Sequence, residues 1–89
     1  MTTCLLDEAL ELHPQVQLRP EPFGALAYHY GNRRLVFLKH RDMVSVAEQL
    51  GQHPSLSATL TACDIAPGRW PSFEQAFASL KASEIVRER

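Results

Sequence analysis

The chain has 89 residues, 45% of them hydrophobic and 21% charged, which is ordinary for one small globular domain. Its formal net charge is −1, so it has no overall basic field that would hold a nucleic acid. No apolar run approaches the roughly 18 residues of a membrane span, and the N-terminus lacks the basic region of a secretory signal. We therefore expect a cytoplasmic protein with neither a membrane nor a nucleic-acid partner.

Residues 1–11 are predicted to be an N-terminal extension, followed by a single domain over residues 12–89. The leucines and Ala9 of the extension fit a short amphipathic helix, and a segment that stays mobile until it packs is the alternative. The two cysteines, Cys4 and Cys63, are far apart and form no CxxC or metal-type spacing. We expect reduced thiols, with a single disulfide as the alternative.

Three segments at the front of the chain have the alternation that indicates β-strands. The first covers residues 15–19 and is limited by Pro20, because proline has no amide hydrogen to donate to a sheet. The other two meet at Gly31-Asn32, which predicts a two-residue type II′ hairpin turn with Gly31 at positive φ. The sequence therefore predicts a three-stranded antiparallel sheet with an open edge.

The predicted turn also sets the register of the hairpin, because the numbers of paired residues then sum to 63. Both faces of the hairpin are apolar. One carries Leu26, Tyr28, Leu35 and Phe37, and the other carries the generally smaller Ala25, Ala27, Val36 and Leu38. A sheet that helices cover on one face normally has a polar outer face. The smaller face is therefore expected either to line a binding site or to be covered by the N-terminal segment.

Three helices are predicted after the sheet. The first lies within residues 39–51, with Asp42 as its N-cap and Gly51 as its C′ glycine. The second begins at Ser55, and the third begins with the capping box Ser72–Gln75 after a loop at residues 64–69. The apolar stripes of the three helices are Met43, Val46, Ala47 and Leu50; Leu56, Leu60 and Cys63; and Phe73, Ala76, Phe77 and Leu80. This order predicts an α+β fold of the winged-helix type.

No recognisable catalytic or metal-binding motif appears in the sequence. The four histidines, His13, His29, His40 and His53, have no HxxxH or HExxH spacing, and His29 is expected to be exposed on a strand. There is no GxSxG motif and no glycine-rich phosphate loop. We therefore expect a non-catalytic protein with no metal and no cofactor.

Two functional interpretations remain open on the residues alone. An open sheet edge captures extended peptides, and the basic residues Arg33, Arg34, Lys39 and Arg41 would suit an acidic partner, although they also suit a solvated surface. The alternative is a winged-helix DNA-binding module or another protein-interaction module. DNA binding is the weaker of these, because the third helix offers one cation where several phosphate contacts are needed.

Two stretches of the sequence resemble a known family. LHPQVQLRPEPFGALAYHYGNRRLVFLK at residues 12–39 and PSFEQAFASLKAS at residues 71–83 are similar to the PqqD-like peptide chaperones, the RiPP precursor peptide recognition elements. Within that family the likeness is to the chaperones of mycofactocin biosynthesis. It extends over residues 12–86 and is specific in the first stretch but generic in the second.

The resemblance implies a three-stranded sheet followed by three helices. It also implies that the leader of a ribosomally made precursor peptide adds as a strand beside the third strand and fills a cleft against the third helix. The peptide-binding residues would be Arg34, Leu35, Val36, Phe37, Leu38 and Lys39 on the strand, and Phe73, Phe77, Leu80 and Lys81 on the cleft wall.

The family role that goes with this site is delivery. The chaperone presents the precursor to a radical S-adenosylmethionine (SAM) maturase, which modifies the C-terminal Val-Tyr of the peptide. The iron–sulfur cluster and S-adenosylmethionine belong to that enzyme, so no cofactor is expected here. Self-association through the open strand edge is a further expectation when no peptide is bound.

Overall fold

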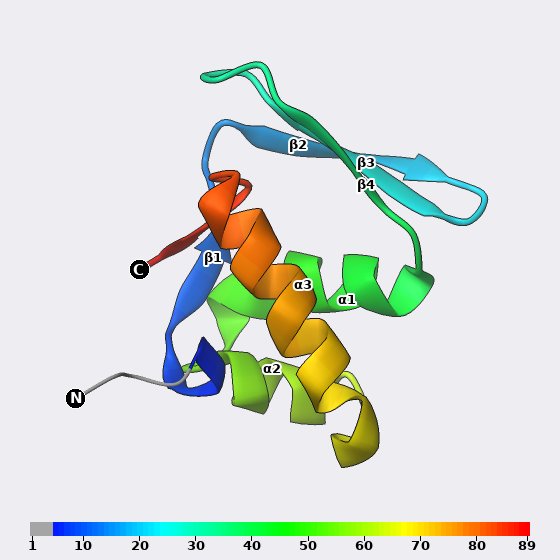
Figure 1. The fold of residues 1–89 in the computed structure, drawn as a ribbon, viewed down its shortest axis with the longest axis vertical. Helices are drawn as coiled ribbons and strands as arrows, with labels where there is room; N and C mark the ends of the chain where they lie inside the picture. The colour runs from blue at the N-terminus through cyan, green and yellow to red at the C-terminus, as the bar shows by residue number, and fades with distance from the viewer. Residues whose placement is uncertain (1–4) are drawn as a thin grey trace.

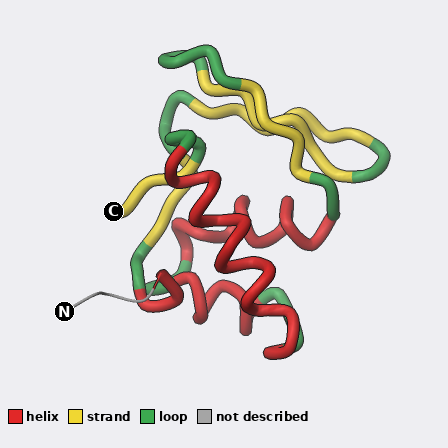
Figure 2. Tube along the Cα trace, in the orientation of Figure 1, coloured by secondary structure: helices red, strands yellow, loops and turns green. Residues whose placement is uncertain are grey.

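The computed structural model describes residues 5–89 and has the predicted α+β architecture, with a three-stranded antiparallel sheet and three helices. Figure 1 shows the sheet together on one side of the helices, and Figure 2 shows the second, shorter pair of strands near the two chain ends. Cys4, one of the two expected thiols, lies outside the described residues.

The sheet is built from β2 (Val16–Glu21), β3 (Gly24–His29) and β4 (Leu35–Leu38), in the order β2-β3-β4. The predicted hairpin register is confirmed, since Tyr28 pairs with Leu35 and the other pairs of β3 and β4 follow the same sum. This register is strongly specified, because a slip by one residue would move every buried side chain to the outer face.

The predicted type II′ turn is wrong. Gly31 does not have a positive φ; the left-handed residue is Arg33, with φ of 61°. The His29 N–H donates to the Arg34 carbonyl at 2.9 Å, and the Arg33 N–H donates to the His29 carbonyl at 2.8 Å, so the connection spans residues 30–33. His29 Nδ1 accepts from the amides of Gly31 and Asn32 at 3.0 and 3.1 Å and so holds the loop from inside.

His29 was expected on the surface, but it is only 3% exposed. Its ring lies against that of His13, with centroids 4.3 Å apart. The Asn32 side chain, expected only to form the turn, donates to the Ser83 carbonyl at 3.3 Å and to Glu84 Oε2 at 3.1 Å. The hairpin loop is therefore fixed by distant partners as well as by its own residues.

The three helices are α1 (Arg41–Gln49), α2 (Leu56–Ala62) and α3 (Trp70–Ala82). The start of α2 is confirmed, because the Ser55 hydroxyl accepts from the Ala58 N–H at 3.1 Å. Three other boundaries differ from the prediction and need separate explanations.

Asp42 is not the N-cap of α1; it lies in the first turn, where its negative charge favours the helix dipole, and His40 occupies the cap position. Gly51 lies inside the 3₁₀ turn η2 (Leu50–Gln52) and does not terminate α1 with a positive φ. Asp42 and Gly51 therefore do not have the capping roles predicted for them.

Ser72 does not cap α3, because the helix begins at Trp70, directly after the 3₁₀ turn η3 (Pro67–Arg69). Pro71 fits the first turn, where its missing amide hydrogen is not needed. The Trp70 indole N–H donates to the Ile65 carbonyl at 3.0 Å and fixes this entry to the helix.

The two ends of the described chain pair with each other. β1 (Leu10–Leu12) and β5 (Val86–Glu88) form a two-stranded antiparallel sheet. A 3₁₀ turn, η1 (Leu5–Asp7), and β1 replace the amphipathic helix expected in the first residues. Leu10 is completely buried and belongs to the core.

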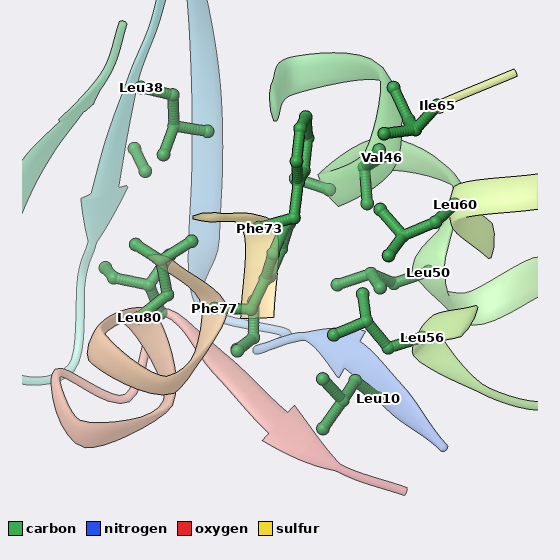
Figure 3. Packing of buried hydrophobic residues seen from close by; sticks show 14 residues of the cluster. Leu10, Leu38, Val46, Leu50, Leu56, Leu60, Ile65, Phe73, Phe77 and Leu80 are labelled. Carbon is green, nitrogen blue, oxygen red and sulfur yellow. The ribbon is translucent and has the colours of Figure 1, made fainter. Parts of the chain in front are cut away.

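The core is enclosed by the three helices, the β1-β5 pair and the inner face of the sheet. Figure 3 shows Phe73 and Phe77 of α3 in the middle, with Leu38 and Leu80 on one side and leucines of the other elements opposite. The smaller face of the hairpin is turned toward the helices, and its members Ala25, Ala27 and Leu38 are buried.

The larger apolar face of the hairpin points outward instead of being polar. Leu35 is 60% exposed and Phe37 is 43% exposed.

Gly24 lies at the start of β3, where the backbone of β4 comes very close. A Cβ at this position would lie 1.8 Å from the Leu38 carbonyl oxygen. A glycine is therefore needed for β3 to approach the end of β4.

Candidate functional site

The edge of β4 is the first part of the candidate site. Antiparallel strands alternate between pairs that exchange backbone hydrogen bonds and pairs that do not. Since His29 bonds to Arg34, the bonded pairs include Val36 with Ala27, and the backbone groups of Leu35 and Phe37 point away from β3. β4 is the last strand of its sheet, so these groups lie at an open edge.

A groove of about 470 Å³ runs between this edge strand and α3. It is lined from the strand side by Val36, Phe37, Leu38, Lys39, His40 and Met43, and from the helix side by Arg69, Ser72, Phe73, Ala76, Ser79 and Leu80. Most of these side chains are apolar or small. A strand placed beside β4 would direct every second side chain toward this groove.

The structure brings six of the ten predicted binding residues together at the groove: Val36, Phe37, Leu38, Lys39, Phe73 and Leu80. Arg34 and Leu35 are exposed near the start of the same strand but do not line the groove. Leu35 instead borders a second depression, of about 540 Å³, on the outer face of the sheet with Tyr28.

Phe77 and Lys81 have other positions. Phe77 follows Phe73 by one helical turn and is fully buried in the core. Lys81 lies on another side of α3, where its ammonium binds Glu8 and approaches Glu88 at 4.0 Å. The hydrogen bond to Glu8 is the main cause that raises the pKa of Lys81.

Six groove residues were missed by the sequence-based assignment: His40, Met43, Arg69, Ser72, Ala76 and Ser79. The helical spacing of Ser72, Ala76 and Ser79 with Phe73 was a usable signal, because residues three and four apart share a helix face. No local signal marked Met43 or Arg69. They reach the groove only because the start of α1 and the turn before α3 meet in the fold.

Arg69 is held in a defined place at the groove. Its Nη1 lies 2.9 Å from Asp42 Oδ2, and its guanidinium carbon lies 5.3 Å from the centre of the Phe73 ring. Stacking of a guanidinium over an aromatic face is favourable and restricts the side chain. Arg69 thus connects the first turn of α1 to the wall of the groove.

The described residues hold neither a metal-binding group nor an activated cysteine. Across residues 5–89, no group of three His, Cys, Asp or Glu side chains is placed to hold a metal ion. Burial, together with the charge of Asp42, raises the pKa of the Cys63 thiol, which disfavours the nucleophilic thiolate. No helix in this part of the chain is both long and apolar enough to span a bilayer.

The fold and the site together define a small α+β domain that offers one open strand edge beside an apolar groove. The chain belongs to the peptide chaperone MftB family, whose model matches residues 9–87. The resemblance seen in the sequence to a peptide recognition element of the MftB type is therefore confirmed.

Individual relatives agree with this membership. The chain is 41% identical over 80 residues to "Peptide chaperone MftB" of Mycolicibacterium smegmatis (strain ATCC 700084 / mc(2)155), covering 90% of this chain and 78% of that protein. Identity to the protein of the same name from Mycobacterium ulcerans (strain Agy99) is 38% over 80 residues, covering 90% and 73%. The Mycobacterium tuberculosis (strain ATCC 25618 / H37Rv) protein is 52% identical over 50 residues, covering 56% and 46%. No solved structure matches the chain significantly.

Proposed function

We propose that this protein is a non-catalytic, cytoplasmic chaperone that binds the leader of a ribosomally made precursor peptide by strand addition to β4. It presents the bound precursor to a radical SAM maturase in mycofactocin biosynthesis. The relatives named as peptide chaperones support the binding role. The leader, the maturase and the pathway rest on the family resemblance.

The observation that carries the proposal is the position of the open edge. The outward backbone groups of Leu35 and Phe37 form the open edge, and from Val36 onward the same strand lines the apolar groove, so one extended segment would occupy both. Its backbone would pair with β4, and alternate side chains would enter between Val36 and Leu38 on one wall and Phe73 on the other. Backbone pairing supplies affinity, and the groove supplies selectivity.

The alternative DNA-binding interpretation has less support. The only cation of α3 is Lys81, and the carboxylates of Glu8 and Glu88 lie beside its ammonium. A helix that reads DNA needs several phosphate contacts from free cations.

The strand edge of β4 is also available to a second copy of the chain, and we expect any such self-association to compete with the peptide.

The test is a calorimetric titration with the synthetic leader of the precursor, using a pair of variants at one position. Phe37→Pro removes an amide hydrogen that points to the open edge, while Phe37→Ala keeps that hydrogen and removes only the side chain. We expect one-to-one binding to the wild type, a loss of at least about tenfold in Phe37→Pro, and a smaller loss in Phe37→Ala.

Far-UV circular dichroism of both variants is the folding control. A folded Phe37→Pro protein that binds the leader as tightly as Phe37→Ala would rule out strand addition at β4. Delivery is tested separately, by adding the chaperone to the maturase and the full precursor. Modification of the C-terminal Val-Tyr should depend on wild-type chaperone and fall with Phe37→Pro.

A further inference from the structure

The basic residues that line the groove are gathered at one end of it. Lys39 and His40 directly follow β4, and Arg69 directly precedes α3. The ion pair of Arg69 with Asp42, in the first turn of α1, brings these two points of the chain together. Ser79 lies ten residues beyond Arg69, about 15 Å along the helix, and the lining there carries no charge.

Of the two cations at this end, Lys39 and Arg69, only Arg69 has an ion-pair partner among the described residues. Within residues 5–89, the side chains of Lys39 and His40 have no hydrogen-bond or ion-pair partner, and both residues are exposed. Asp42 balances Arg69, but the Arg69 side chain remains 51% exposed. A guanidinium has five N–H donors, so it can bind a second carboxylate while Asp42 holds it in place.

We propose, building on the function proposed above, that the groove recognises a carboxylate at its Lys39 end. The bound segment carries an Asp or Glu side chain that lies against Lys39 and Arg69, next to the apolar side chains that fill the groove. This contact fixes which way the segment lies along β4, because the backbone pairing alone fits more than one placement.

Two other cations that the resemblance places at the site, Lys81 and Arg34, do not line the groove. Lys81 was expected on the cleft wall, but the structure places it against Glu8 and Glu88. Arg34 is exposed at the opposite end of β4 and outside the groove lining. Arg34 and Lys39 are five residue steps apart along the strand, roughly 17 Å. This exceeds the Debye length of about 8 Å at physiological salt, so Arg34 is a matched control for a charge change.

The experiment combines variants of the full chain with variants of the synthetic leader. In a set of leader copies, each Asp or Glu is replaced in turn by Asn or Gln. We expect one copy to bind the wild type about fivefold more weakly than the native leader, as for the loss of one partly exposed charge pair. Lys39→Glu should weaken the native leader at least as much and have little further effect on that copy.

Arg34→Glu should change the affinity for the native leader by less than about twofold. Raising NaCl from about 50 to 500 mM should weaken binding of the native leader. It should hardly change binding of the leader copy that lacks the recognised carboxylate. Both exposed positions tolerate substitution, and circular dichroism checks that the variants fold.

The outcomes separate the two proposals. If the native leader binds and no copy is weaker, or if Lys39→Glu and Arg34→Glu weaken it equally, the carboxylate contact is wrong and the peptide-binding function stands. If the folded wild type does not bind the native leader, the proposed function is wrong and this contact falls with it.

Discussion

The two edge strands of the sheet differ in what they offer to another chain. On β4, Leu35 and Phe37 both direct backbone groups to the open edge. On β2, the residues that face outward are Val16, Leu18 and Pro20, because Tyr30 bonds to Gln15 and sets the alternation. The Val16 N–H already donates to the His13 carbonyl at 2.9 Å, and Pro20 has no N–H.

Only the Leu18 amide therefore remains as an outward donor in the paired part of β2. Proline at an edge is a known way to prevent unwanted strand pairing. The difference teaches that the sheet is protected at one edge and open at the other, and that the open edge is the one beside the groove. A specific acceptor of an extended peptide needs both properties.

The largest loss of stability should come from a proline at a β4 position whose backbone N–H bonds to β3. Val36 bonds to Ala27, which is fully buried, so Val36→Pro leaves an Ala27 carbonyl without its partner. We expect a loss of roughly 1–3 kcal/mol in the free energy of unfolding. Phe37→Pro, whose amide faces outward, should cost clearly less. Equal midpoints in urea for the two variants would show that the alternation is assigned incorrectly.

We expect pH to have a moderate effect on the free energy of unfolding through His13, which lies just before β2. His13 Nδ1 accepts from the Gln15 N–H at 3.1 Å. Desolvation lowers the pKa of His13, and the charges of His29 and Arg87 lower it further, against the opposing influence of Glu84 and Glu11. The folded state thus binds fewer protons than the unfolded state just below the ordinary value of 6.5.

Stability should therefore be constant above pH 6.5 with respect to this group and fall as the pH drops through the lower pKa of the folded protein. Urea unfolding at pH 5 to 8 measures it. His13→Asn keeps an acceptor near the Nδ1 position but does not titrate, so it should flatten part of the slope. An unchanged slope in that variant would assign the acid sensitivity to other groups.

The smallest change in stability should follow Pro20→Ala, because position 20 is exposed and its nitrogen faces away from β3. We expect a change within about 0.5 kcal/mol. The variant gains a second outward donor on β2, so its self-association should increase. Sedimentation at several concentrations measures this, with Arg19→Ala as a control on the same strand. Identical behaviour of both variants would mean that Pro20 does not protect the edge.

Much of the fold was accessible from the sequence because it depends on short-range periodicity. The alternation of the hairpin predicts its register, and the spacing of Phe73, Phe77 and Leu80 predicts the buried face of α3. The exact turn was not accessible, because His29 and Asn32 shape it through side-chain bonds, one of them to Ser83. Those contacts exist only in the folded chain.

The candidate site divides in the same way. The strand half of the groove follows from recognising β4, while Met43 and Arg69 come from two segments that meet through the tertiary structure. The pairing of β1 with β5 was hidden for a related reason, since it joins residues such as Glu11 and Arg87 from opposite ends of the sequence. Periodicity describes each segment but not which distant segment it meets.

The shortness of β4 has a consequence for any peptide held there. Four strand residues measure roughly 14 Å, so the anchor engages only a few residues of the ligand. The remainder of the peptide is a tether, and a flexible tether of ten residues spans on the order of 17 Å. In the proposed delivery role, the length of this tether would set the effective concentration of the reacting end at the partner enzyme.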